Sequence, residues 1–157
     1  MKHLSLLTLA LVVVCAVGLS AQGTNFSGSW ALDEAKSQMP QMGNRGGGRG
    51  AGGPMTIKQT ATELTIERAG MGGQTMTTVY KLDGSETVTT TGRGEQKSTC
   101  KWDGGKLVVK TVADFQGNTM ETTAVYSLSA DGKVLTVETT RMTPNGEMKS
   151  TMVYNKQ

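Results

Sequence analysis

Apolar and polar residues alternate with a period of two along most of the chain, from Met55 to Tyr154. Such alternation, rich in Thr, Val and Tyr, is typical of β-strands that bury one face. Gly-containing turn signals interrupt it every eight to twelve residues, and their Asp-Gly and Asn-Gly pairs suit tight hairpins. These turns divide the segment into nine strands, and one more strand is expected from about Phe26 to Asp33.

Ten strands joined by short connections predict an all-β fold in which neighbours in sequence are antiparallel neighbours in space. An up-and-down antiparallel β-barrel closes such strands without exposed edges, and we expect this fold. The outward positions carry Lys, Glu and Thr, whereas a barrel that spans a membrane needs its apolar stripe outside. The pattern therefore argues against a membrane span.

The first 21 residues follow a different pattern, with Lys2 and His3 before an apolar run from Leu4 to Leu19. This layout is typical of a secretory signal peptide and is too short for a membrane helix. We expect cleavage near Ala21, a periplasmic or secreted location in a bacterium, and a single domain over 22–157.

Cleavage would remove the only histidine and leave Cys100 as the only cysteine. Without His, the Ser-His-Asp, Cys-His and His-zinc chemistries are excluded. The acidic residues alternate outward or lie in turns, so no carboxylate pair converges, and we expect no enzyme activity and no cofactor. A lone Cys in an alternating strand is typically a small buried side chain, and we expect this of Cys100.

Residues 34–54 are too rich in glycine to pack and are expected to form a flexible loop. Within it, Met39 and Met42 form a Met-x-x-Met element whose thioethers suit Cu(I), and methionine-based copper binding is one alternative function. The net charge of +3, from 16 basic and 13 acidic residues, is too balanced to indicate a nucleic-acid partner.

The segment Asn25–Leu32, with its Phe-Ser-Gly-Ser-Trp sequence, resembles the opening of lipocalins and fatty-acid-binding proteins. In those families a Phe-x-Gly-x-Trp pattern begins the first strand, and its Trp plugs one end of the barrel. Lys101–Gly104 is similar to a late hairpin of fatty-acid-binding proteins, and the chain as a whole is similar to secreted bacterial lipocalin-like proteins. The resemblance implies a calycin barrel. The last strand carries Lys149 and Lys156 where lipocalins place an Arg over the Trp.

Strand direction assigns each inward residue to one pole of the expected barrel. One pole collects the large rings and is expected to be a closed plug made of Trp30, Trp102, Tyr126 and Tyr154. The opposite pole collects the Gly-rich loop, all five arginines and most of the methionines. This segregation is the most specific feature of the sequence.

Arginines above a Met-rich cavity suit a small apolar or amphipathic anionic ligand. No carboxylate falls on the inward stripes, so Arg68 and Arg141 would meet the polar end of such a ligand. The wall of the cavity would be formed by Met76, Met120, Met148, Phe115 and Thr139. The alternative is a structural or partner-binding barrel with a filled interior, in which both arginines are hydrated at strand ends.

Overall fold

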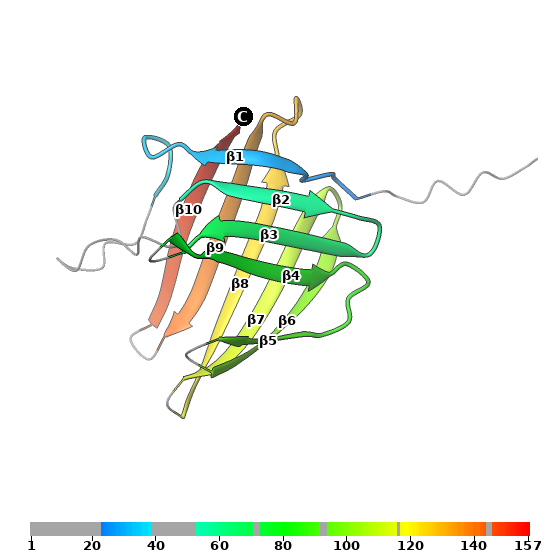
Figure 1. Ribbon diagram of the computed structural model, residues 1–157. Coiled ribbons are helices and arrows are strands. Elements are labelled where there is room, and N and C mark those ends of the chain that lie inside the picture. Colours follow the sequence, from blue (N-terminus) through cyan, green and yellow to red (C-terminus); the bar gives the residue numbers. More distant parts are fainter. Residues whose placement is uncertain (1–22, 39–52, 71–72, 92–93, 116, 144–145) are drawn as a thin grey trace, which may run out of the picture.

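The computed structural model describes residues 23–38, 53–70, 73–91, 94–115, 117–143 and 146–157. Its ten strands form one antiparallel sheet that curls into a nearly closed barrel (Figure 1), which confirms the predicted fold class. The strands are β1 (Gly28–Leu32), β2 (Met55–Gln59), β3 (Glu63–Ala69), β4 (Thr75–Lys81), β5 (Thr87–Thr91), β6 (Gly94–Asp103), β7 (Lys106–Phe115), β8 (Asn118–Leu128), β9 (Val134–Thr143) and β10 (Gly146–Lys156).

The order of strands in the sheet is β4-β3-β2-β1-β10-β9-β8-β7-β6-β5, so the first strand pairs with the last. This leaves β4 and β5 as the two edges, although they are adjacent in sequence. The prediction of a barrel without edges was therefore wrong at this one junction. At this junction the backbone N–H of Lys81, at the end of β4, donates to the side-chain hydroxyl of Thr87, at the start of β5, 3.2 Å away.

The sheet contains a group of short strands and a group of long strands. The strands β1–β4 have five to seven residues, whereas β6–β10 have ten or eleven. Figure 1 shows β1–β4 crossing the long strands at a steep angle, with β7–β10 extending beyond them. Burial along β9 follows from this, because Leu135 and Val137 are buried while Arg141, on the same face, is exposed.

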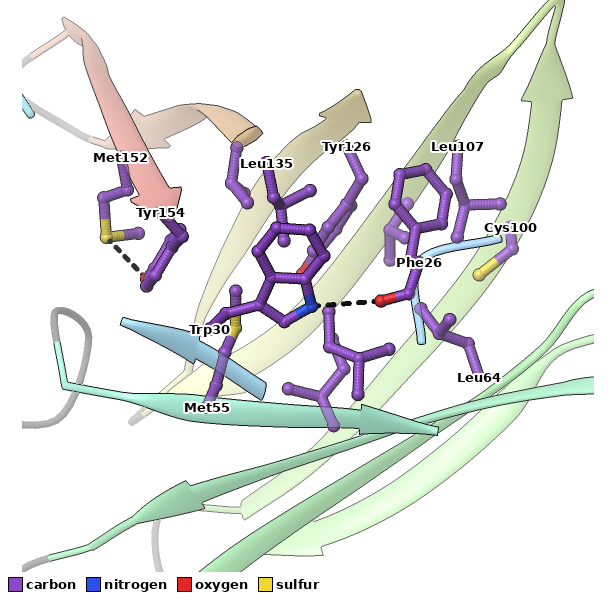
Figure 2. Close-up of a cluster of buried hydrophobic side chains, with 14 residues drawn as sticks. Phe26, Trp30, Met55, Leu64, Cys100, Leu107, Tyr126, Leu135, Met152 and Tyr154 are labelled. Atoms are coloured by element: carbon purple, nitrogen blue, oxygen red, sulfur yellow. Dashed lines mark hydrogen bonds between the residues drawn. The ribbon is translucent and has the colours of Figure 1, made fainter. Parts of the chain in front are cut away.

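The core lies where the short strands cover the long ones, and Trp30 is at its centre (Figure 2). The indole Nε1–H of Trp30 donates to the carbonyl of Phe26 at 3.0 Å. The ring of Phe26 stacks on Trp102, with centroids 6.0 Å apart, and meets Tyr126 edge-on at 6.3 Å. These geometries are favourable for aromatic pairs, so the few rings of the chain support one another.

The segment before β1 covers this aromatic cluster. Gln59 binds this segment at two points. Its side chain accepts a hydrogen bond from the backbone N–H of Phe26 at 2.9 Å and donates one to the carbonyl of Thr24 at 3.1 Å. Gly23 lies directly on Trp102, and a Cβ at this position would be 2.5 Å from the indole ring. Only a glycine allows the backbone to approach the ring so closely.

The expected flexible loop over 34–54 is only partly described. Its beginning is ordered, because residues 34–36 form a turn and Gln38 pairs with Thr151 of β10 through two backbone hydrogen bonds of 2.7 and 2.8 Å. Residues 39–52 lie outside the described ranges. Within the part of the chain that the structure describes, no helix has the length and apolar character needed to cross a membrane.

Candidate functional site

A cavity of about 90 Å³ lies between the short strands and the long ones. Its wall consists of Ile66 and Arg68 of β3, Met76, Thr78 and Tyr80 of β4, and Tyr126 of β8. Met76 is 57% exposed although it lines the cavity, so the cavity opens to solvent beside it. The volume suits a polar head group or a few water molecules, since sites for whole drug-sized ligands measure roughly 300–1,000 Å³.

Arg68 is the only charged residue in this wall. Its Nη2 donates to the sulfur of Met55 at 3.3 Å, and its Nε is buried with no hydrogen-bond partner among the described residues. The adjacent Glu67 points to the other face of the sheet, where its carboxylate pairs with Lys58 at 2.8 Å. A buried donor on a cationic group without a matching acceptor is costly, so the site favours an incoming acceptor.

Three tyrosines lie close enough to Arg68 for its charge to lower their pKa values. Burial nevertheless raises the pKa of Tyr80, Tyr126 and Tyr154 above the usual value. The hydroxyls therefore stay protonated at neutral pH. Tyr126, Tyr80 and Arg68 line the same cavity, so these hydroxyls and the guanidinium lie around one space. A guanidinium beside neutral phenols forms a set of hydrogen-bond donors that suits an anion.

The residues predicted to form the ligand site are divided by the structure. Arg68 and Met76 line the cavity and are direct partners across β3 and β4. Met120, Met148 and Thr139 are partly exposed on β8, β10 and β9, and do not line it. The backbone of Phe115 pairs with Asn118 at the end of β7, and its side chain lies outside the described part.

Arg68 and Arg141 do not meet at one polar end, as the sequence had suggested. Arg141 is exposed on β9, with Thr122 and Met148 as its strand partners. Arg68 instead shares the cavity wall with Tyr80 and Tyr126. The physical reason is the steep crossing of the two groups of strands, which brings the inward face of β3 and β4 over Tyr126 rather than over the rim (Figure 1).

The aromatic residues expected to close one pole lie in the core. Trp30, Tyr126 and Tyr154 are buried, and Trp102 is partly buried against them. Tyr126 belongs both to this core and to the wall of the cavity. Sequence reasoning did not place Tyr80, Ile66 and Thr78 at a ligand site. The signal was present, because all three share the inward face with Arg68 and Met76.

Lys156 lies over the ring of Trp30, with its Nζ 5.4 Å from the ring centroid. Of the two lysines singled out on the last strand, Lys156 is therefore the one that lies over this Trp. Gly28 makes room for it, because a Cβ there would be 2.8 Å from Cε of Lys156. The φ of Gly28 is 147°, a conformation that side-chain-bearing residues rarely adopt.

Within the described ranges, no group of three His, Cys, Asp or Glu side chains could hold one metal ion. Met39 and Met42, the candidates for Cu(I), lie outside these ranges. Cys100 is buried, as expected from its place in an alternating strand, and burial raises its pKa to about 11.

No protein-family model and no curated protein matches this chain in sequence. Solved structures match in fold. A secretory abundant heat soluble protein of Ramazzottius varieornatus has a TM-score of 0.63 at 15% identity, covering 86% of this chain and 97% of its own. The zebrafish ileal bile acid-binding protein, in complex with cholic acid, has a TM-score of 0.61 at 16% identity, covering 84% and 98%. A fatty acid transporter has a TM-score of 0.55 at 16% identity, with the same coverage. The chain therefore has the fold of calycin-like barrels.

Proposed function

We propose that this protein binds a small amphipathic anion, with Arg68 as the site of the head group. The observation that carries the proposal is the side chain of Arg68, which lines a cavity and whose buried Nε lacks a partner in the described structure. Tyr126 and Tyr80 offer neutral hydroxyls beside it, so an anionic oxygen would complete the set.

The size of the cavity determines how such a ligand fits. A volume of about 90 Å³ takes the head group and leaves the tail outside. The tail would leave beside Met76, whose flexible thioether adapts to different chains, and continue along the inward face of the long strands. This mode of binding differs from full enclosure of a long chain.

The similar solved structures support a binding role, because they include a bile acid-binding protein and a fatty acid transporter. The proposal includes export, since the apolar run from Leu4 to Leu19 has the layout of a signal peptide. N-terminal sequencing of the protein from its source cells would test export directly, and an intact Met1 would contradict it.

Calorimetric titration with dodecanoate tests the binding site. Arg68→Met removes the guanidinium, and we expect affinity to fall by roughly tenfold or more, because hydrogen bonds to charged groups contribute about 1.5–3 kcal/mol. Lys110→Met is the matched control, since it removes the same charge from an exposed position on β7. Equal affinity in wild type and Arg68→Met, or an equal loss in both variants, would overturn the proposal.

A further inference from the structure

Arg141 lies on the inward face of the long strands. It is an even number of residues from the buried Leu135 and Val137 on β9, so its side chain is on the same face of the sheet as theirs. Its strand partners on this face are Thr122 of β8 and Met148 of β10. In the described structure no ion pair involves Arg141.

Carboxylates near Arg141 belong to the opposite face of the sheet. Glu121 and Glu147 both pair with Met142, the next residue along β9, and Glu147 also pairs with Lys149 at 2.7 Å. Strand alternation directs these groups away from Arg141. Across all the described strands no Asp or Glu has inward parity, so the two inward arginines are left without internal counter-ions.

The register gives the separation of the two arginine sites along the sheet. Tyr126, which lines the cavity beside Arg68, pairs with Val137. Thr122, the partner of Arg141, lies four residues earlier on β8. At the rise of an antiparallel strand these two rows are about 13 Å apart.

The surface between the two rows is polar enough for an elongated ligand but offers no third charge. Ala124 and Thr139 form its middle row and are half-buried. Their outer partners are Val109 of β7 and Ser150 of β10. Thr111 lies one row further along, opposite Thr122, and its hydroxyl is 2.9 Å from that of Ser98. A chain lying here would contact methyl groups and hydroxyls.

We propose that the ligand is a two-headed anion whose first anionic group binds at Arg68 and whose second binds at Arg141, about 13 Å further along the inward face. This inference rests on the proposed function, because Arg68 provides the first contact. It adds a length and a second charge to the ligand class. Long-chain dicarboxylates have this chemistry.

Dodecanedioate, dodecanoate and the shorter octanedioate are suitable probes in calorimetric titrations. We expect the wild type to bind dodecanedioate roughly three- to tenfold more tightly than dodecanoate, since a solvent-accessible ion pair contributes up to about 1 kcal/mol and a charge-assisted one somewhat more. Octanedioate is too short to reach Arg141, so its second carboxylate should add no affinity. Added salt should reduce the advantage of dodecanedioate.

Arg141→Gln isolates the second contact. It should remove the part of the dodecanedioate advantage that comes from the second ion pair, and leave dodecanoate binding unchanged. The statistical benefit of having two equivalent ends does not depend on Arg141, so dodecanedioate keeps it in this variant. Lys149→Gln is the matched control, because it lies one strand away on the outer face. If dodecanoate binds through Arg68 while Arg141→Gln has no effect on dodecanedioate, the two-headed ligand is refuted and the proposed function stands. If no probe responds to Arg68→Met, both proposals fail.

Discussion

The Nζ of Lys156, near the end of the last strand, lies 5.4 Å from the centroid of the Trp30 ring on the first strand. The two strands are hydrogen-bonded neighbours, and Trp30 and Lys156 are direct partners in the register. This cation–π contact therefore stabilises the junction where the two ends of the chain meet in the sheet.

Replacing Lys156 by Met should lower the free energy of unfolding by about 0.5–1 kcal/mol, because the cation over the indole is lost while the apolar stem is kept. Urea denaturation followed by tryptophan fluorescence measures this. Lys149→Met is the control, since Lys149 contacts Glu147 at the surface. An equal effect of both variants would show that the contact with Trp30 contributes nothing specific.

Replacing Phe26 by Ala should destabilise the protein by about 3–5 kcal/mol, because its side chain is fully buried between Trp102 and Tyr126. The bond from Trp30 to the backbone carbonyl of residue 26 would be retained. Urea denaturation measures the loss. Phe26→Leu keeps most of the volume and should cost less, and a loss below about 1 kcal/mol in Phe26→Ala would contradict the packing described here.

Replacing Arg68 by Met should weaken anion binding yet stabilise the ligand-free protein, by about 1 kcal/mol or more, since it removes a partly unpaired charge from the interior. Thermal denaturation without ligand measures this, with Arg141→Met as the exposed counterpart. A less stable Arg68→Met protein would mean that the contacts of Arg68 with Met55 and Tyr126 outweigh its desolvation.

Cys100 should make the protein less stable at alkaline pH. Burial raises its pKa from 9.0 to about 11 in the folded chain, so between these values the unfolded chain loses a proton that the folded chain keeps. The contribution is fully present below pH 9 and is lost as the pH rises towards 11. The free energy of unfolding measured from pH 8 to 11 should fall less steeply in Cys100→Ala than in wild type. Identical slopes would contradict the pKa shift.

The edges β4 and β5 should exchange their backbone amide hydrogens faster than the paired strands β8 and β9, because an edge strand leaves part of its N–H groups outside the ladder. Hydrogen exchange followed by mass spectrometry or NMR tests this. Protection of β4 and β5 equal to that of β8 would show that the gap is closed in solution.

Much of the fold could be predicted from local pattern. Alternation along each strand, and Asp-Gly or Asn-Gly at the turns, depend on steric preferences of neighbouring residues, so the ten strands were predictable. The same parity placed Trp30, Tyr126 and Tyr154 inside. The opening between β4 and β5 was not predictable, because it depends on how far the sheet must curl before its two edges meet.

The sequence by itself determined which residues face inward, including Arg68 and Arg141 on a face without carboxylates, because side-chain direction in a strand follows from a period of two. Only the tertiary structure decided which inward residues meet. Whether Arg68 lies beside Arg141 or beside Tyr126 depends on the angle at which the short strands cross the long ones. That angle arises from the accumulated twist and coiling of the whole sheet, which no local stretch of sequence specifies.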